Sequence, residues 1–228
     1  MRVLRGRAES IEADRRVTAG MLERAGETRK PAVRVWTPHR QLAFGRRDAN
    51  EPDYGEAYEI AEKRGFPPVE RSVGGRAVAY TGTTLAFAHV IPIDDPREGL
   101  NARYDGASER VREALASLGV TVERGEPPES FCPGAHSLST DGKIVGIAQR
   151  VTSRTALVSG IVVVADRGEI AGVLSPVYNA LSISFDPDSV GSVARAGGPD
   201  DPERVARAIE DRLVDGTPQK IERIDRKP

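Results

Sequence analysis

A single dipeptide, Asp141-Gly142, sets the local fold of the stretch between residues 130 and 150. An Asp-Gly pair between two strand-forming segments is a strong signal for a tight β-hairpin. The returning strand begins at Lys143 and carries a glycine, Gly146, in its interior. Glycine weakens a strand and often marks a place where a ligand or another backbone comes close. The hairpin therefore predicts a sheet in which one strand approaches a ligand.

The only cysteine of the chain, Cys132, lies on a Pro-Gly turn eleven residues before Lys143. A thiol on a turn beside an ammonium on a neighbouring strand is a candidate activated nucleophile, because a nearby positive charge favours the reactive thiolate. Each residue alone has a plainer interpretation. A lone cysteine is commonly a small buried hydrophobe, and most lysines are solvated surface charges. His136 is a weaker candidate base for the thiol, since four residues along a turn do not fix the geometry.

The spacing of apolar residues and capping signals predicts four helices, over residues 9–24, 53–64, 108–118 and 202–214. Strand-forming segments are more numerous, and they cover residues 33–36, 41–45, 69–72, 76–80, 84–91, 120–122, 143–148 and 156–164. These elements do not alternate regularly. We therefore expect an α+β domain with a mostly antiparallel or mixed sheet flanked by helices. We expect one domain over residues 1–216 and a polar C-terminal tail over residues 217–228.

Composition narrows the class of protein. The formal net charge of −1 gives no electrostatic reason to expect nucleic acid as a partner. The longest apolar run, residues 156–165, is too short and too β-branched to span a bilayer, so we expect no membrane segment. One cysteine cannot form an internal disulfide, and residues 1–7 are not followed by an apolar signal core, so a cytoplasmic location is expected. The three histidines lack metal-ligand spacing, and no metal site is expected.

Four sequence pieces occur together in order. They are the strand ending at Trp36, the segment Phe44-Gly45-Arg46, the loop Arg71-Ser72-Val73-Gly74-Gly75-Arg76-Ala77-Val78, and the strand from Gly142 to Arg150. Together they resemble the lipoate–protein ligase and octanoyltransferase family, which is related to the biotin ligases. The resemblance covers roughly residues 30–165. It implies a biotin/lipoate ligase-like catalytic domain in which the glycine loop and the lysine-bearing strand form two sides of a tunnel for a medium-length acyl chain.

The same resemblance assigns roles to residues. Cys132, in a Phe-Cys-Pro-Gly segment, is similar to the cysteine that holds the acyl group as a thioester in cysteine-dependent octanoyltransferases and amidotransferases. Lys143 matches the family lysine that contacts the reacting carbonyl, and it would also lower the pKa of the thiol. The expected substrate-binding residues are Arg71, Ser72, Gly74, Gly75, Arg76, Ala77, Gly146 and Ala148. Small residues suit this role because they permit close approach of an acyl chain to the backbone.

The implied function is a protein acyltransferase that moves an octanoyl or lipoyl group to a lysine of a lipoyl carrier domain, without a cofactor. The implied partners are an acyl donor protein and a carrier, either the glycine-cleavage carrier protein or a 2-oxoacid dehydrogenase E2. One alternative is an ATP-dependent lipoate–protein ligase chain that uses ATP and Mg²⁺ to form lipoyl-adenylate. Against it, Arg76 replaces the third glycine of the ligases, and Tyr80-Thr81 replaces their His-Asp pair. Another alternative is a non-catalytic binder of lipoylated carrier protein. The sequence does not separate octanoyl from lipoyl.

The hairpin also predicts where the lysine points. Strict alternation from the turn places Lys143 on the same face as Val145 and Ile147, and opposite Ile144, Gly146 and Ala148. We expect a partly buried Lys143 within side-chain reach of Cys132 and of the loop over residues 72–76.

Overall fold

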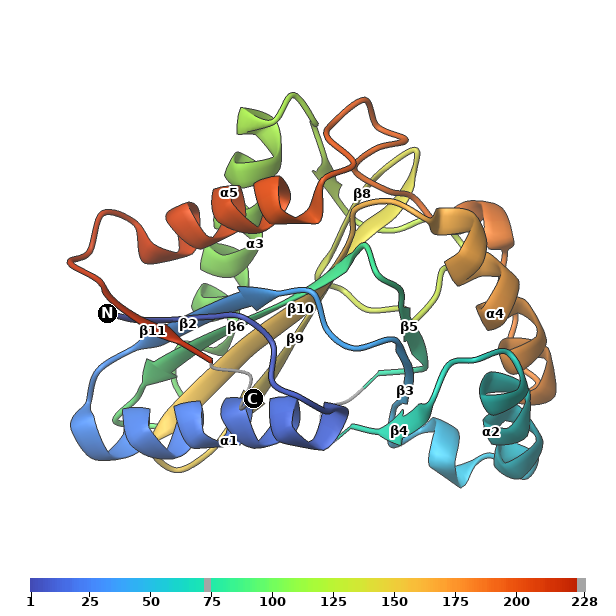
Figure 1. The fold of residues 1–228 in the computed structure, drawn as a ribbon, viewed down its shortest axis with the longest axis horizontal. Helices are drawn as coiled ribbons and strands as arrows, with labels where there is room; N and C mark the ends of the chain where they lie inside the picture. Colours follow the sequence, from blue (N-terminus) through green and yellow to red (C-terminus); the bar gives the residue numbers. More distant parts are fainter. Residues whose placement is uncertain (72–74, 225–228) are drawn as a thin grey trace.

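The computed structural model describes residues 1–71 and 75–224. Its main feature is an eight-stranded sheet with the order β11-β1-β2-β6-β10-β9-β8-β7 (Figure 1). The strands are β1 (Arg2–Arg5), β2 (Ala32–Trp36), β6 (Thr84–Pro92), β7 (Glu123–Arg124), β8 (Ser137–Thr140), β9 (Gly142–Val151), β10 (Thr155–Val163) and β11 (Lys220–Arg223). β1 runs parallel to β2 and β11, and the pairs from β2 to β7 are antiparallel. The predicted α+β class with a mixed sheet is confirmed.

A second, three-stranded sheet lies beside the main one and has the order β4-β3-β5. Its strands are β3 (Gln41–Phe44), β4 (Pro68–Glu70) and β5 (Val78–Tyr80). The loop between β4 and β5 contains residues 72–74, which lie outside the described residues. Of the predicted site residues, Ser72 and Gly74 therefore have no described position. The small sheet matters for function because it brings both ends of this loop toward the main sheet.

Within the described residues, five α-helices cover these sheets: α1 (Ile11–Thr28), α2 (Tyr54–Lys63), α3 (Leu100–Ser117), α4 (Arg167–Ala180) and α5 (Pro202–Val214). Two short 3-10 helices, η1 (Asp48–Asn50) and η2 (Pro187–Ser189), lie between them. Figure 1 shows α1 across one face of the main sheet, α3 and α5 on the other, and α2 beside α4 next to the small sheet. No helix in the described part of the chain combines the length and apolar character needed to cross a bilayer.

Local sequence explains where the best-predicted helices start and stop. α1 begins after Ser10, whose hydroxyl accepts a hydrogen bond from the backbone N–H of Ala13. It ends at Arg29, which adopts the left-handed conformation common at helix C-termini. α5 is capped by Asp201 and has Pro202 at its first position, where a missing N–H costs nothing.

Several elements differ from the expectation, among them β1, which was not predicted. α3 begins at Leu100, so Ser108 is a buried mid-helix residue and not an N-cap. Residues 120–122 form no strand, and the short β7 follows them. α4 was not predicted. Finally, β11 lies within the predicted polar tail yet pairs with β1 along four residues, held also by an Arg2–Glu222 ion pair of 2.7 Å. The division of the chain at residue 216 stays a prediction.

Candidate active site

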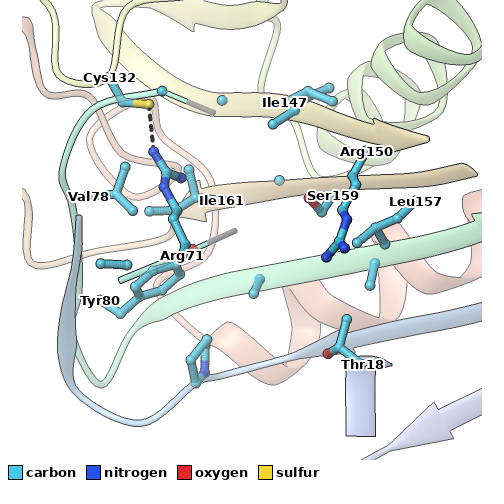
Figure 2. Close-up of a pocket in the computed structure, with 18 of the residues that line it drawn as sticks. Thr18, Arg71, Val78, Tyr80, Cys132, Ile147, Arg150, Leu157, Ser159 and Ile161 are labelled. Carbon is cyan, nitrogen blue, oxygen red and sulfur yellow. Dashed lines mark hydrogen bonds between the residues drawn. The ribbon is translucent and has the colours of Figure 1, made fainter. Parts of the chain in front are cut away.

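A cavity of about 710 Å³ opens on the face of the main sheet that α1 covers. This volume is within the usual range for small-molecule sites. Figure 2 shows Cys132 and Arg71 at one end of the cavity, and Arg150, Leu157 and Thr18 at the other. We call the first end the cysteine end. An extended ligand attached to the sulfur would run along the strands.

Small side chains form the floor of this cavity. The strand register places Gly146 beside Ile161, and Ala148 beside Ser159, which in turn pairs with Ala88. All five residues line the cavity. Side chains two apart on a strand lie on the same face, so glycine and alanine at successive floor positions leave a shallow trough. The predicted roles of Gly146 and Ala148 in binding an acyl chain are consistent with this placement.

Cys132 has an uncommon backbone conformation. Its φ is +42°, a region that non-glycine residues rarely adopt and that costs on the order of 1–3 kcal/mol. The Cys132 N–H donates a hydrogen bond of 2.6 Å to the hydroxyl of Tyr178. Its Sγ lies 3.1 Å from Nη2 of Arg71 and 3.3 Å from the backbone N of Arg76, both of which donate to it. The thiol is thus held between a guanidinium and a peptide N–H.

Among the described residues, Arg71 is the one cationic side chain that hydrogen-bonds to the sulfur. Its guanidinium also donates to the carbonyl oxygen of Arg76, and among the described residues it forms no ion pair with a carboxylate. Burial disfavours its charge, but Cys132 and Tyr80 outweigh that effect, and the pKa of Arg71 is raised. It therefore stays charged at neutral pH. A fixed cation at this distance is the kind of neighbour that activates a cysteine.

Lys143 is buried and faces the loop that carries the cysteine. Its Nζ donates to Oε2 of Glu126 at 2.7 Å, to the carbonyl oxygen of Phe131 at 2.9 Å, and to that of Cys132 at 2.8 Å. An ammonium has three donors, so all three are used on the segment from Glu126 to Cys132. The lysine is within reach of the cysteine, as expected, but it holds the cysteine's backbone while Arg71 contacts the sulfur.

Glu126 is a site residue that the sequence analysis missed. Besides Lys143, its carboxylate accepts hydrogen bonds from the backbone N–H of Gly134 at 2.8 Å and from the hydroxyl of Ser137 at 2.7 Å. It therefore ties both ends of the cysteine loop, residues 126–137, to β9. No pattern in the sequence distinguishes it from the other glutamates. Only the fold shows that it faces a buried lysine.

The predicted face of Lys143 is wrong. Leu138 pairs with Val145, but the next residue, Ser139, pairs with Lys143, so β9 has one extra residue at this point. Such a β-bulge breaks strict alternation. Val145 consequently packs under α3 and α5, while Cε of Lys143 lies 3.4 Å from where a Cβ on Gly146 would be. The bulge turns the lysine toward the cavity.

The glycine loop approaches the cysteine so closely that side chains are excluded. A Cβ on Gly75 would lie 2.6 Å from Sγ of Cys132, and φ at Gly75 is +103°. A Cβ on Gly45 would lie 1.8 Å from the carbonyl oxygen of Gly75. Both positions require glycine. They are the contacts that allow the small sheet to present its loop to the thiol.

Arg76 and Ala77 do not line the cavity, although both were predicted to bind substrate. The Arg76 side chain points away and pairs with Asp48 at 3.3 Å and Glu51 at 2.6 Å. Asp48 is buried, and burial raises its pKa despite hydrogen bonds from Gly45 and Arg76. The Arg76 backbone, held by these pairs, is what reaches the sulfur. Arg71, Gly75, Gly146 and Ala148, by contrast, all line the cavity.

His136 is not placed as a base for the thiol. Its ring stacks on Tyr104 of α3 with centroids 3.7 Å apart and an interplanar angle of 7°. Among the described residues it forms no hydrogen bond with Sγ of Cys132. Both rings line the cavity and form part of its wall.

The main sheet is mixed, and one of its faces is hollowed beneath a helix. The glycine loop and the lysine-bearing strand meet at one end of this cavity. This arrangement is that of a catalytic domain of the lipoate ligase type. The chain belongs to the family described as the lipoyl protein ligase A/B catalytic domain, which matches residues 11–213.

Solved structures agree on the fold. Lipoate-protein ligase A bound with ATP superposes with a TM-score of 0.78 over 98% of this chain and 89% of that chain, at 18% identity. A putative lipoate protein ligase from T. acidophilum with bound lipoic acid gives a TM-score of 0.74, covering 98% and 89% of the two chains, also at 18% identity. At this identity the likeness shows the fold alone.

Curated relatives are similar over part of their length. The "Octanoyl-[GcvH]:protein N-octanoyltransferase" of Macrococcus caseolyticus is 32% identical over 126 residues, which are 55% of this chain and 46% of that protein. The "Lipoyl-[GcvH]:protein N-lipoyltransferase" of Listeria monocytogenes is 28% identical over 119 residues, 52% and 43% of the two. The chain thus matches somewhat less than half the length of these relatives.

Proposed function

We propose that this domain transfers an octanoyl or lipoyl group to a lysine of a lipoyl carrier domain through a thioester on Cys132. The observation that carries the proposal is the placement of Sγ at the head of the cavity, between the Arg71 guanidinium and the Arg76 N–H. The relatives are named as acyltransferases acting with GcvH, and this supports the substrate class. The trough beyond the sulfur suits an apolar chain.

The reaction has two acyl-transfer steps. The Cys132 thiolate attacks the carbonyl carbon of the donor, a carrier thioester or an acylated carrier lysine. The C–S or C–N bond to the donor breaks, and the leaving thiolate or amine takes up a proton. The neutral acceptor lysine then attacks the thioester, releasing the thiolate and losing a proton. Negative charge on the carbonyl oxygen in both steps is stabilised by donors beside the sulfur, which Arg71 and the Arg76 N–H supply.

Lys143 fits this scheme as the residue that fixes the cysteine loop. The resemblance gives it a contact with the reacting carbonyl, but its three hydrogen bonds go to Glu126 and to two loop carbonyls. To reach the substrate, Nζ has to exchange one of these bonds for the acyl oxygen. In either arrangement its charge remains beside the reacting centre.

In the described part of the cysteine end of the cavity, few charged groups are free to bind the phosphates of a nucleoside triphosphate. Phosphates require several unneutralised cations or backbone N–H donors. Among the described residues here, Arg76 is paired with two carboxylates, Lys143 with Glu126, and Arg71 faces the sulfur. No ATP-dependent step is therefore part of the proposal. The second candidate, a lipoate–protein ligase, would have to break these pairs.

One experiment separates the candidates. The protein is incubated with an octanoylated donor carrier, or with lipoate, ATP and Mg²⁺, and then with an apo carrier domain. We expect an octanoyl adduct on Cys132 by mass spectrometry, ATP-independent transfer, and loss of both in Cys132→Ser. Lipoate-dependent pyrophosphate release that survives Cys132→Ser would support the ligase. Saturable binding of the lipoylated carrier without turnover would support a binding domain.

A further inference from the structure

The strained backbone of Cys132 is held by a residue from a distant helix. Tyr178 belongs to α4, which packs against α2 and the small sheet (Figure 1). Its side chain is fully buried and does not line the cavity. It therefore cannot act by touching substrate from this position. Any influence on the reaction has to pass through the groups that it bonds.

The hydroxyl of Tyr178 joins the two loops of the site. It accepts the Cys132 N–H at 2.6 Å and donates to the carbonyl oxygen of Ala77 at 3.0 Å. Ala77 follows Arg76, whose N–H donates to the sulfur. One hydroxyl therefore links the residue that carries the thiol to the loop before β5, which supplies the hydrogen-bond donor to the sulfur.

The bridge needs the neutral hydroxyl, since a phenolate could still accept the Cys132 N–H but could not donate to the Ala77 carbonyl. Burial raises the pKa of Tyr178 well above its ordinary value, and the nearby Cys132 adds to this effect. The hydroxyl therefore stays neutral, and the bridge stays intact, at neutral pH. The Cys132 N–H is also committed to this bond, which leaves the Arg76 N–H as the peptide donor at the sulfur.

We infer that Tyr178 is a positioning residue: its hydroxyl holds Cys132 in the left-handed conformation that places Sγ between Arg71 and the Arg76 N–H. This inference rests on the proposed acyl transfer for its kinetic consequence, but the placement of the sulfur can be measured without any acyl donor. Without the hydroxyl, the positive φ at Cys132 relaxes and the sulfur leaves its donors.

The test uses Tyr178→Phe in the full chain, which removes the hydroxyl and keeps the ring. We expect the pH profile of Cys132 alkylation by iodoacetamide to move to higher pH, because the sulfur loses its cation and its N–H donor. In transfer assays kcat should fall at least ~10-fold with KM changed less than ~2-fold, since substrate contacts are untouched. Tyr54→Phe is the matched control. It also loses a tyrosine hydrogen bond, to Glu70 at 3.1 Å, and should change neither readout.

A lower melting temperature with an unchanged alkylation profile and unchanged kcat per folded molecule would overturn the inference and leave Tyr178 a structural residue. If the wild type transfers no acyl group, the proposed function fails, but the alkylation profiles still decide the role of Tyr178. Should Tyr178→Phe not fold, amide hydrogen exchange in the native protein provides the second test. The Cys132 N–H should exchange as slowly as amides of β9, although it lies in a loop, and rapid exchange would contradict the bridge.

Discussion

At the scale of single residues, a substitution of Lys143 distinguishes a lysine held in a buried site from a lysine solvated at the surface. Its ammonium fills a buried site made of one carboxylate and two carbonyl oxygens. A guanidinium keeps the charge but is planar and larger, so it does not fit three converging acceptors. We expect Lys143→Arg to lower the rate of acyl transfer at least ~10-fold, equivalent to ~1.4 kcal/mol in barrier. The control is Lys63→Arg, which changes an exposed lysine paired with Glu59. Equal transfer rates for the two variants would contradict a role of the buried Lys143 site in acyl transfer.

Gly75 tests the closeness of the glycine loop to the thiol. An added Cβ would lie 2.6 Å from Sγ of Cys132 and 2.8 Å from Nη2 of Arg71, so Gly75→Ala has to push the sulfur away from its cation. We expect transfer to fall at least ~10-fold. Gly65→Ala is the control that separates steric crowding at the thiol from backbone strain. Gly65 also has a positive φ, +74°, but no described atom lies near the position of an added Cβ. That variant should lose about 1–2 kcal/mol of stability and retain activity per folded molecule. Full activity in Gly75→Ala would show that the loop is not packed on the thiol.

At the scale of elements, the sequence predicted what local patterns encode. The helices with clear caps, α1 and α5, and the long strands β6, β9 and β10 lie close to their expected ranges. α4 was missed although Ile170, Val173, Leu174 and Val177 have helical spacing, because Pro176 within the segment argues against a helix.

Non-local geometry decided the remaining features of the site. The bulge that turns the Lys143 side chain to the other face of the sheet depends on how β8 pairs with β9. No residue at the Asp141-Gly142 turn predicts this bulge. Glu126 and Tyr178 act through contacts with segments 17 and 46 residues away along the chain. Cys132, Lys143 and the glycine loop could be found because they occur as motifs. Their supporting residues could not, since one carboxylate or phenol has no motif.

At the scale of the whole molecule, the cavity lies where two hydrophobic clusters fail to merge. One cluster joins the small sheet to α2 and α4 and includes Ile161. Another joins α1 to the main sheet and includes Ala88 and Leu157. A third cluster fills the opposite face beneath α3 and α5. This arrangement leaves a hollow face for a ligand while the other face of the sheet supplies continuous packing.

The central strand β6 also makes the stability of the whole fold depend on pH. Burial, together with the charge of Arg110, lowers the pKa of His89 to about 4. The folded protein therefore keeps this imidazole neutral, while the unfolded chain, with an ordinary pKa near 6.5, takes up a proton as the pH falls. The contribution of the neutral His89 to stability is fully present above about pH 6.5 and is lost progressively toward pH 4. By pH 5 this loss lowers the free energy of unfolding by about 2 kcal/mol. Urea unfolding between pH 7.5 and 5 measures this slope. His89→Gln should flatten this slope, whatever its effect on stability at pH 7.5. A slope that survives His89→Gln would assign the pH dependence to other groups.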